Sequence, residues 1–302
     1  MPPVTVVIPT RDRPELMRAA AQSVVAQDYP GDIELIVVFD AGEVAPVELD
    51  LGPNRTLRTL TNSRTPGLAG ARNTGTMAAS HGLVASLDDD DTWMPGKLSA
   101  QVPLFAESDE VVLVASAMEV DDGQRRHVRL APGDLVTHAE LIANRIPALH
   151  SSSFVFRRDV LVGRLGMIDE RLPGSYGEDY DVLLRTAQIT PVRVVNEPLV
   201  SVRWTGQSYF YGRWETYAAA LQHLLVTHPE FLANPPALGR IQSQIAFALA
   251  ASGRHVESRP WARQALRVDR RDKRALLALA VSYRIAPPNW IARAANLFGR
   301  GI

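Results

Sequence analysis

Residues 83–93 read LVASLDDDDTW, a short apolar run that leads directly into four aspartates, Asp88 to Asp91. The run from Leu83 to Leu87 predicts a buried strand. In open α/β sheets ligands bind beyond the carboxyl ends of the strands, where these carboxylates would lie. Hard cations such as Mg²⁺ or Mn²⁺ prefer oxygen ligands and commonly bridge carboxylates to phosphates. The stretch therefore indicates a metal site, although a solvated acidic turn would have the same composition.

Short β-branched runs alternate with helical patterns over the first two thirds of the chain, which predicts an α/β fold with a mainly parallel sheet. The expected strands are Val4–Ile8, Glu34–Phe39, Val111–Ser116 and Ser152–Phe156, in addition to the strand at Leu83. The expected helices run from Pro14 to about Gln27, from Leu68 to Ser80, and onward from Glu178. Between Ala117 and Ile146 the pattern weakens, and Asp121-Asp122-Gly123 predicts a hairpin turn.

Composition excludes several classes of protein. The 302 residues, 46% of them hydrophobic, can bury a full core, and a net charge of -1 gives no case for a nucleic-acid partner. The absence of cysteine excludes disulfides and thiolate metal sites. No apolar run approaches the roughly 18 residues of a membrane span, and the N-terminus lacks the pattern of a secretory signal. We therefore expect a cytoplasmic protein.

Beyond Trp204 alanine, leucine and arginine dominate and strand signals disappear. This change predicts two domains, residues 1–208 and an α-helical C-terminal domain, residues 209–302. Ala248-Leu249-Ala250 reappears as Ala278-Leu279-Ala280, which resembles a degenerate tetratricopeptide repeat, while a plain helical cap remains the alternative. The basic helices could make peripheral contact with the inner face of a membrane. The tail Trp290–Ile302 is either a core helix or an interfacial one.

Two further features accompany the aspartates. Asp40 follows the strand Glu34–Phe39, so it should project from the same sheet edge as Asp88 and could bind a nucleobase or ribose, or else cap a turn. Gly67 to Asn73 forms a glycine-flanked loop that runs into a helix, and its Arg72 could contact phosphate. The chain has neither GxGxxG after the first strand nor GxxxxGK[ST], which argues against dinucleotide and P-loop enzymes.

A third acidic cluster, Gly177-Glu178-Asp179-Tyr180-Asp181, lies at a predicted helix start behind a glycine-rich loop. Acids in a first helical turn ordinarily offset the helix dipole. A carboxylate at such a place could also act as a general base that removes a proton from an attacking hydroxyl.

The ordered set of motifs resembles the inverting glycosyltransferases of family 2 over about residues 4–205. The segments that carry the resemblance are VVIPTRDRP (residues 6–14), SVVAQDYP (23–30), ELIVVFD (34–40), residues 67–75, LDDDDTW (87–93) and GEDYDVLLR (177–185). The resemblance implies a GT-A fold, a Rossmann-like sheet flanked by helices, that binds a nucleotide-diphosphate sugar at the carboxyl edge of the sheet.

The resemblance also assigns roles. It places Pro9, Arg11 and Asp40 at the nucleoside and Arg72 near the diphosphate. Asp88 and Asp90 match the DxD motif, with Asp90 as the direct ligand of Mn²⁺ or Mg²⁺ and with Asp88 or Asp89 near the ribose. Asp179 matches the catalytic base, and Glu178 is its neighbour.

The chain departs from the family pattern at three places. Arg11 stands where an aromatic residue is usual, Asp40 is the only acid left of a common acidic pair, and Asp89 is an additional aspartate. Three more residues, His150, Arg203 and Trp204, are candidates for contact with acceptor or phosphate, with a structural role equally open.

These features predict a metal-dependent inverting glycosyltransferase that moves a sugar, from a UDP donor by the resemblance, to a hydroxyl of a saccharide or lipid-linked acceptor in envelope or exported glycan synthesis. Two alternatives remain open. One is a sugar nucleotidyltransferase, against which the missing glycine-rich basic loop argues. The other is a non-catalytic nucleotide-sugar-binding scaffold.

Overall fold

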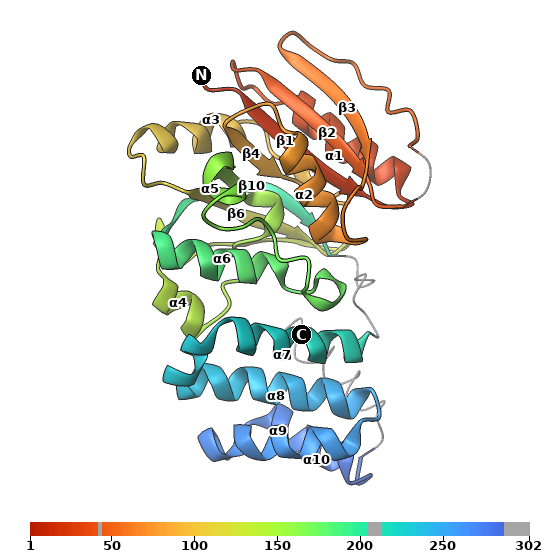
Figure 1. Cartoon of the computed structure of the whole chain (residues 1–302), viewed down its shortest axis with the longest axis vertical. Coiled ribbons are helices and arrows are strands. Elements are labelled where there is room, and N and C mark those ends of the chain that lie inside the picture. The colour runs from red at the N-terminus through yellow and green to blue at the C-terminus, as the bar shows by residue number, and fades with distance from the viewer. Residues whose placement is uncertain (42–43, 205–212, 287–302) are drawn as a thin grey trace. The chain divides into compact units, whose positions relative to one another are not determined.

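The computed structural model describes residues 1–41, 44–204 and 213–286 (Figure 1). The chain divides into two compact units. The first contains Met1–Leu141, Arg145–Glu170 and the chain from Glu178 through the last strand. The second contains Ile142–Asn144, Arg171–Gly177 and the C-terminal helices.

The first unit is built on a ten-stranded sheet. Its strands are β1 (Val4–Thr10), β2 (Ile33–Phe39), β3 (Arg55–Thr61), β4 (Leu83–Ser86), β5 (Thr92–Trp93), β6 (Leu113–Asp121), β7 (Arg126–Arg129), β8 (Leu135–Val136), β9 (Val155–Arg157) and β10 (Val192–Arg203). They follow the order β3-β2-β1-β4-β9-β6-β10-β5, with β7 beside β6 and β8 beside β10. The three longest pairings, β1 with β2, β2 with β3 and β6 with β10, are parallel, whereas β9 enters antiparallel between β4 and β6. The predicted α/β fold with a mainly parallel sheet is confirmed.

Helices flank the sheet and form the second unit. In order they are α1 (Pro14–Val25), α2 (Leu68–Ala78), α3 (Lys97–Gln101), α4 (His138–Ala143), α5 (Arg158–Val162), α6 (Glu178–Ile189), α7 (Trp214–Thr227), α8 (Pro235–Ala251), α9 (His255–Val268) and α10 (Lys273–Ser282). Short 3-10 turns lie at Val102–Ala106, Ser151–Ser153, Pro173–Ser175 and Pro229–Ala233.

Strand β1 is buried on both faces because a different helix covers each one (Figure 1). Alternate side chains of a strand point to opposite faces. Val6 shares a core cluster with Met17 of α1, whereas Val7 shares one with Ala71 of α2. Helix α2 approaches closely because Gly75 faces the strand, where an added Cβ would lie 2.3 Å from Cγ1 of Val7.

The parallel register brings the ends of β1, β2 and β4 to one edge of the sheet. Thr10 pairs with Phe39, and the N–H of Asp40 donates to the carbonyl of Thr10 at 2.8 Å. On the other side of β1, the N–H of Leu87 donates to the carbonyl of Val7 at 3.1 Å. The carboxylates that follow β2 and β4 therefore lie along one edge, as the sequence predicts.

Two strand predictions have wrong boundaries. Strand β6 continues through Asp121, across residues whose pattern is weak, because β10 pairs with it along this length. The predicted strand at Ser152 begins only at Val155. Ser153 donates its hydroxyl to the carbonyl of His150 at 2.7 Å, and such local bonds favour a turn over a strand. The hairpin turn at Gly123 is confirmed, since β7 pairs antiparallel with β6.

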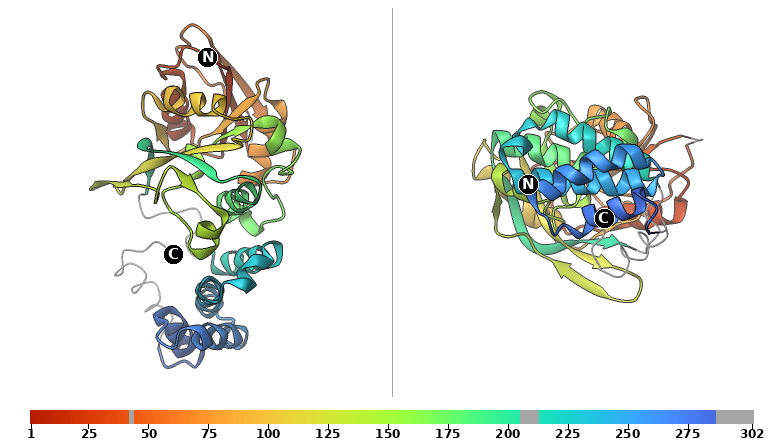
Figure 2. Two further views of the ribbon diagram at one scale, coloured as in Figure 1. Left: turned by 90° about the vertical axis from the view of Figure 1, so that its left-hand side faces the viewer. Right: turned by 90° about the horizontal axis from the view of Figure 1, so that it is seen from below.

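Helices α8, α9 and α10 of the second unit pack around a core of small residues (Figure 2). Ala250, Ala262, Ala265 and Ala278 are buried in this core. The similar segments 248–254 and 278–284 lie at equivalent helix ends. In both, a serine hydroxyl, of Ser252 or Ser282, donates to the carbonyl three residues earlier. Whether this arrangement is a tetratricopeptide relative stays a prediction.

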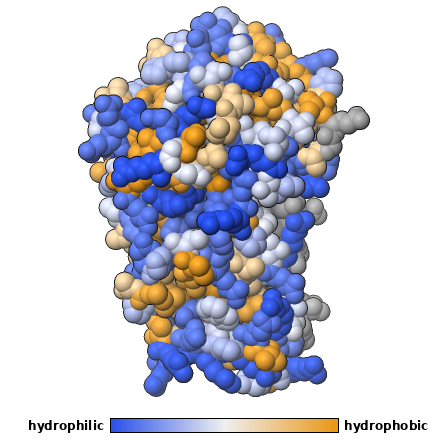
Figure 3. Space-filling model, in the orientation of Figure 1, coloured by the Kyte–Doolittle hydropathy of each residue, from blue (hydrophilic) through white to orange (hydrophobic). Residues whose placement is uncertain are grey.

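Among the helices that the structure describes, none combines the length and the apolar character that a membrane span requires. On the face of the second unit in Figure 3, hydrophilic residues are mixed with small apolar areas. The predicted tail Trp290–Ile302 lies outside the described residues.

Lys97, the first residue of α3, is fully buried. Its ammonium group lies 4.0 Å from the centroid of the Trp93 ring and has no hydrogen-bond partner. Burial lowers the pKa of Lys97 well below its ordinary value, because an unpaired charge in the core is costly.

The Lys97→Met variant is expected to be more stable than the wild type at neutral pH. Between the lowered pKa of Lys97 in the folded chain and its pKa in the unfolded chain, only the unfolded chain binds a proton at this side chain, so wild-type stability should rise there by about 1.4 kcal/mol per pH unit. The variant should lose this rise in urea unfolding at pH 7 and 9. Lys273→Met, which changes the other lysine of the chain at an exposed position, should keep it. Identical slopes in all three proteins would contradict a neutral Lys97.

Candidate active site

The four aspartates after β4 alternate between open and buried positions. The side chains of Asp88 and Asp90 are 18% and 33% exposed, whereas those of Asp89 and Asp91 are 11% and 2% exposed. The four residues form a turn after β4, in which the N–H of Asp91 donates to the carbonyl of Asp88 at 3.2 Å. Asp88 and Asp90 are therefore the two carboxylates that a ligand can reach, and they have the spacing of a DxD motif.

Asp89 fastens the aspartate loop to the end of β1. It accepts hydrogen bonds from the hydroxyl of Thr10 at 2.8 Å, from the N–H of Arg11 at 3.4 Å and from the guanidinium of Arg13 at 3.3 Å. Burial raises the pKa of Asp89 to about 6 against the opposing effect of these bonds. The same guanidinium reaches Asp90 at 2.8 Å.

Asp91 connects the aspartate loop to the second half of the sheet. Its carboxylate accepts from the hydroxyl of Ser152 at 2.6 Å and from the N–H of Arg203 at 3.0 Å, and Nδ1 of His150 lies 3.4 Å away. Burial raises the pKa of Asp91, and the negative charges of Asp88 and Asp90 add to that effect.

One cluster of ligand atoms could hold a metal ion. Single atoms of Asp88, Asp91 and His150 lie within 4.8 Å of one another. Two carboxylates and an imidazole suit Mn²⁺ or another divalent transition metal. The cluster includes the predicted ligand Asp88 and, in place of Asp90, its neighbour Asp91. The role of Asp90 stays a prediction, because this carboxylate pairs with Arg13.

Arg72 of α2 is a buried bridge between two acidic clusters. Its guanidinium, 4% exposed, pairs with Asp88 after β4 and with Glu178 at the start of α6, and it donates to the hydroxyl of Ser151 at 3.1 Å. Burial opposes the charged form, but the two carboxylates more than offset it and raise the pKa of Arg72. Because one terminal nitrogen pairs with Asp88 and the other with Glu178, the side chain joins the aspartate loop to α6. Its predicted contact with a diphosphate is untested.

The Arg72→Met variant is expected to lose about 3–5 kcal/mol of unfolding free energy, because the buried carboxylate of Glu178 and the partly buried carboxylate of Asp88 would lose their cation. Urea unfolding at neutral pH measures this loss. Arg11→Met is a suitable control: Arg11 is half exposed and its one ion pair, with Asp12, spans 3.8 Å, so a loss below about 1 kcal/mol is expected. Equal, small losses in both variants would refute the bridge.

Asp179, the predicted base, is held by an arginine that the sequence did not single out. Arg145 donates to both carboxylate oxygens, at 2.8 Å and 3.1 Å, and the N–H of Tyr180 donates at 2.8 Å. Burial would raise the pKa of Asp179, but Arg145 and the neighbouring bonds lower it. The carboxylate is therefore ionised at neutral pH, as a proton acceptor must be. Burial raises the pKa of its neighbour Glu178, against the effect of Arg72.

Asp40 organises the loop before α2. Its Oδ1 accepts from the side-chain amide of Asn62 at 2.7 Å and from the N–H of Gly67 at 2.8 Å. Gly67 has φ of 126°, a conformation that favours glycine. Pro9 is buried in β1 and Arg11 is exposed just beyond it, so these two and Asp40 surround the ends of β1 and β2.

The three predicted candidates for contact with acceptor or phosphate, His150, Arg203 and Trp204, lie at two different places. His150 and the backbone of Arg203 contact Asp91, so both belong to the aspartate site. The ring of Trp204 instead lies 4.7 Å from the guanidinium of Arg129 on β7. Sequence patterns missed Arg13, Arg145 and Ser151 to Ser153, because lone arginines and serines in loops carry no periodic signal.

Comparisons with known proteins agree with this geometry. The sequence matches the family described as Glycosyl transferase family 2 over residues 5–163. Among curated relatives, an uncharacterized glycosyltransferase of Rickettsia prowazekii is 25% identical over 67% of this chain and 64% of its own length. The Escherichia coli UDP-Glc:alpha-D-GlcNAc-diphosphoundecaprenol beta-1,3-glucosyltransferase WfgD is 29% identical over 35% of this chain and 42% of its own length. The chain thus spans less than two thirds of the length of these relatives.

Solved structures share the fold. Residues 1–349 of Staphylococcus aureus TarS, in complex with UDP-GlcNAc, superpose with a TM-score of 0.56 and 15% identity, covering 97% of this chain and 92% of that one. The mannosyltransferase PcManGT from Pyrobaculum calidifontis, in complex with GDP-Man and Mn²⁺, gives 0.53 and 21%, covering 99% and 88%. The family match spans more than half of the sequence and includes the aspartate loop. The chain belongs to glycosyltransferase family 2.

Proposed function

We propose that the protein is a metal-dependent, inverting glycosyltransferase that moves a sugar from a UDP-sugar to a hydroxyl of a saccharide or lipid-linked acceptor. One observation carries the proposal: Asp88 and Asp90 are the two open carboxylates at the edge where β1, β2 and β4 end. A nucleotide-diphosphate sugar beyond this edge would have its nucleoside near Pro9, Arg11 and Asp40. Its diphosphate would face the aspartates.

The residues of the aspartate site fit a divalent cation, because two carboxylates and an imidazole offer hard and borderline ligands within reach of one another. We propose that Asp88 and Asp90 hold Mn²⁺ or Mg²⁺, with Asp91 and His150 as supporting groups. When bound, the ion would offset the negative charge that develops on the departing diphosphate.

Asp179 would act as the base. Its carboxylate accepts the proton of the acceptor hydroxyl while the hydroxyl oxygen bonds to the anomeric carbon and the bond to the diphosphate oxygen breaks. The electron pair of that bond leaves with the nucleoside diphosphate, so the anomeric configuration inverts. Arg145 keeps the carboxylate ionised. One of its two hydrogen bonds to the carboxylate must break so that this oxygen can accept the proton of the acceptor hydroxyl. Through its ion pair with Arg72, Glu178 would orient the first turn of α6, which carries Asp179.

Acceptor chemistry is proposed from relatives, since WfgD is named for a diphosphoundecaprenol acceptor. We further propose that residues 1–208 form the catalytic domain and residues 209–302 a separate helical one, which the two compact units support. We place the reaction in the cytoplasm, with peripheral contact to a membrane through the arginine-rich helices.

Thermal shift of the purified chain with UDP, GDP, dTDP and CDP, each with Mn²⁺, Mg²⁺ or EDTA, tests the donor site. A ligand at 100 times its Kd should add about 2.7 kcal/mol to the folded state. Stabilisation by UDP that requires the metal supports the proposal. Stabilisation by another nucleotide would assign a different nucleobase to the donor. If no nucleotide stabilises the chain, the proposed donor site is contradicted.

A further inference from the structure

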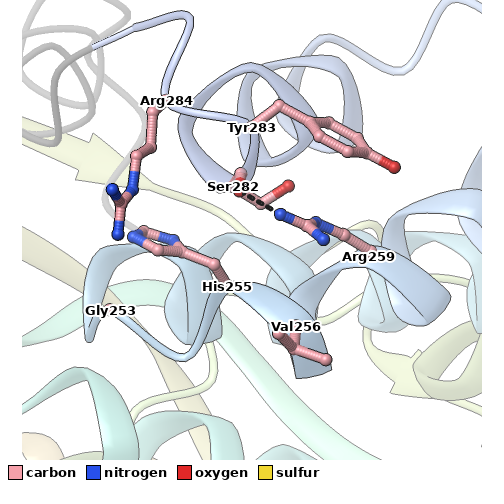
Figure 4. Close-up of a pocket in the computed structure, with 7 residues that line it drawn as sticks. All are labelled: Gly253, His255, Val256, Arg259, Ser282, Tyr283 and Arg284. Carbon is pink, nitrogen blue, oxygen red and sulfur yellow. Dashed lines mark hydrogen bonds between the residues drawn. The ribbon is translucent and has the colours of Figure 1, made fainter.

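A hollow of about 400 Å³ lies in the second unit, between the start of α9 and the end of α10 (Figure 4). Two arginines, a histidine and a tyrosine dominate its lining: His255, Arg259, Tyr283 and Arg284. None of the described residues that line it is acidic. Its volume lies within the range of small-molecule sites, about 300–1,000 Å³.

Arg259 is held in place at this hollow. Its guanidinium stacks on the ring of Tyr283, 4.2 Å from the centroid, and donates to the carbonyl of Ser282 at 2.8 Å. The Tyr283 hydroxyl in turn accepts from Arg263 at 2.7 Å, which fixes the ring. Nε of Arg259 is buried without a hydrogen-bond partner. The result is a positioned cation with an unused donor.

Arg284 adds a second cation on the opposite side of the hollow. In Figure 4 its guanidinium lies beside the ring of His255. Its backbone is in the left-handed region, with φ of 61°, which is uncommon for a residue other than glycine. No carboxylate stands among the described residues that line the hollow with Arg284, so none of them neutralises its charge.

The start of α9 contributes positive potential to the same place. The helix begins at His255, and the preceding Arg254 provides no side-chain cap for its first N–H groups. The N–H of His255 itself donates to the carbonyl of Gly253 at 2.9 Å, and the N–H groups of the first turn give a helix N-terminus a positive potential that attracts anions. The nearby Glu257 is engaged with Arg254, at 2.8 Å and 2.5 Å, and does not line the hollow. Nδ1 of His255 is buried without a partner.

We propose that the α9/α10 hollow, defined by His255, Arg259, Tyr283 and Arg284, binds a phosphate group. The described lining of the hollow carries two guanidinium groups and no carboxylate, so a doubly charged oxyanion bound there would balance their charge. Arginine forks match the oxygen geometry of phosphate. The site is separate from the aspartates of the first unit and does not depend on the proposed transferase function. The phosphate can belong to a free anion or to a lipid headgroup.

Two binding experiments on the full chain in the presence of EDTA test the proposal. Calorimetry measures the binding of inorganic pyrophosphate, and vesicle sedimentation measures the binding of phosphatidic acid. The vesicles are phosphatidylcholine alone and phosphatidylcholine with an equal amount of phosphatidic acid. Arg284→Gln removes a side chain that makes no ion pair or side-chain hydrogen bond among the described residues, so the variant should fold normally. Arg271→Gln makes the same charge change at an exposed position away from the hollow.

Arg284→Gln is expected to weaken binding of at least one probe about tenfold or more, whereas Arg271→Gln should match the wild type. An effect on pyrophosphate indicates a free anion as the ligand. An effect confined to phosphatidic acid vesicles indicates a lipid headgroup. Equal weakening by both variants, or no weakening by Arg284→Gln, would overturn the site and leave only diffuse attraction between charges. Arg259→Gln, with folding checked by circular dichroism, provides a second measurement.

Discussion

Asp179→Asn is expected to lower turnover about thousandfold while leaving donor affinity nearly unchanged. General-base catalysis contributes about 10²–10⁴ to a rate, and asparagine cannot accept the proton of the acceptor hydroxyl. It can still fill the space and accept one hydrogen bond from Arg145. Release of nucleoside diphosphate measures turnover, and the metal-dependent thermal shift measures donor binding.

Asp181→Asn is the control for this experiment. Asp181 lies two residues along in the same helix, and its carboxylate accepts a hydrogen bond from Arg185 at 2.8 Å. It should keep turnover within a few fold. Wild-type turnover in Asp179→Asn would remove Asp179 from the reaction, and loss of donor binding would assign it to the donor site instead.

Asp90→Asn is expected to abolish the stabilisation that nucleotides give in the presence of Mn²⁺. Asp90 is the most exposed of the four aspartates, and a metal ligand must be reachable by the diphosphate. Replacing it removes a charged ligand and leaves Arg13 with Asp89 alone. The measurement is the metal-dependent part of the thermal shift, for which about 2.7 kcal/mol is expected in the wild type at 100 times Kd.

Two neighbouring variants control this result. Asp89→Asn should keep the metal-dependent shift, because Asp89 is bound to Thr10 and Arg13 on the buried side. Asp91→Asn decides between the predicted ligand pair and the cluster of Asp88, Asp91 and His150. If Asp91→Asn abolishes the shift and Asp90→Asn does not, the ion is held by that cluster and the assignment to Asp90 is wrong.

The sheet edge could be predicted from the sequence because it depends on local pattern and on topology. Continuous apolar runs indicated β1, β2 and β4, and parallel strands bring their carboxyl ends together. Asp40 and Asp88 therefore had to lie on one edge. Strand β6 was predicted too short, because its second half is specified by pairing with β10, far along the chain.

The contacts of the site could be predicted less well. Arg145 meets Asp179 across 34 residues, and Arg13 meets Asp90 across 77. Such pairs form when distant loops converge, and neither periodicity nor spacing encodes them. Arg72 was predicted as a phosphate contact from its place in a glycine-flanked loop, whereas its position between Asp88 and Glu178 depends on where α6 begins.

The products released from a nucleotide sugar test the central claim most directly. The purified chain is incubated with UDP-sugars, Mn²⁺ and a panel of saccharide and lipid-linked acceptors, and the released compounds are separated by chromatography. The account predicts UDP as the released nucleotide, dependent on Mn²⁺ and lost in Asp179→Asn. Release of pyrophosphate in a reaction with a sugar phosphate and a nucleoside triphosphate would instead indicate a nucleotidyltransferase. Tight metal-dependent binding without any release would indicate a non-catalytic scaffold and contradict the proposed transferase.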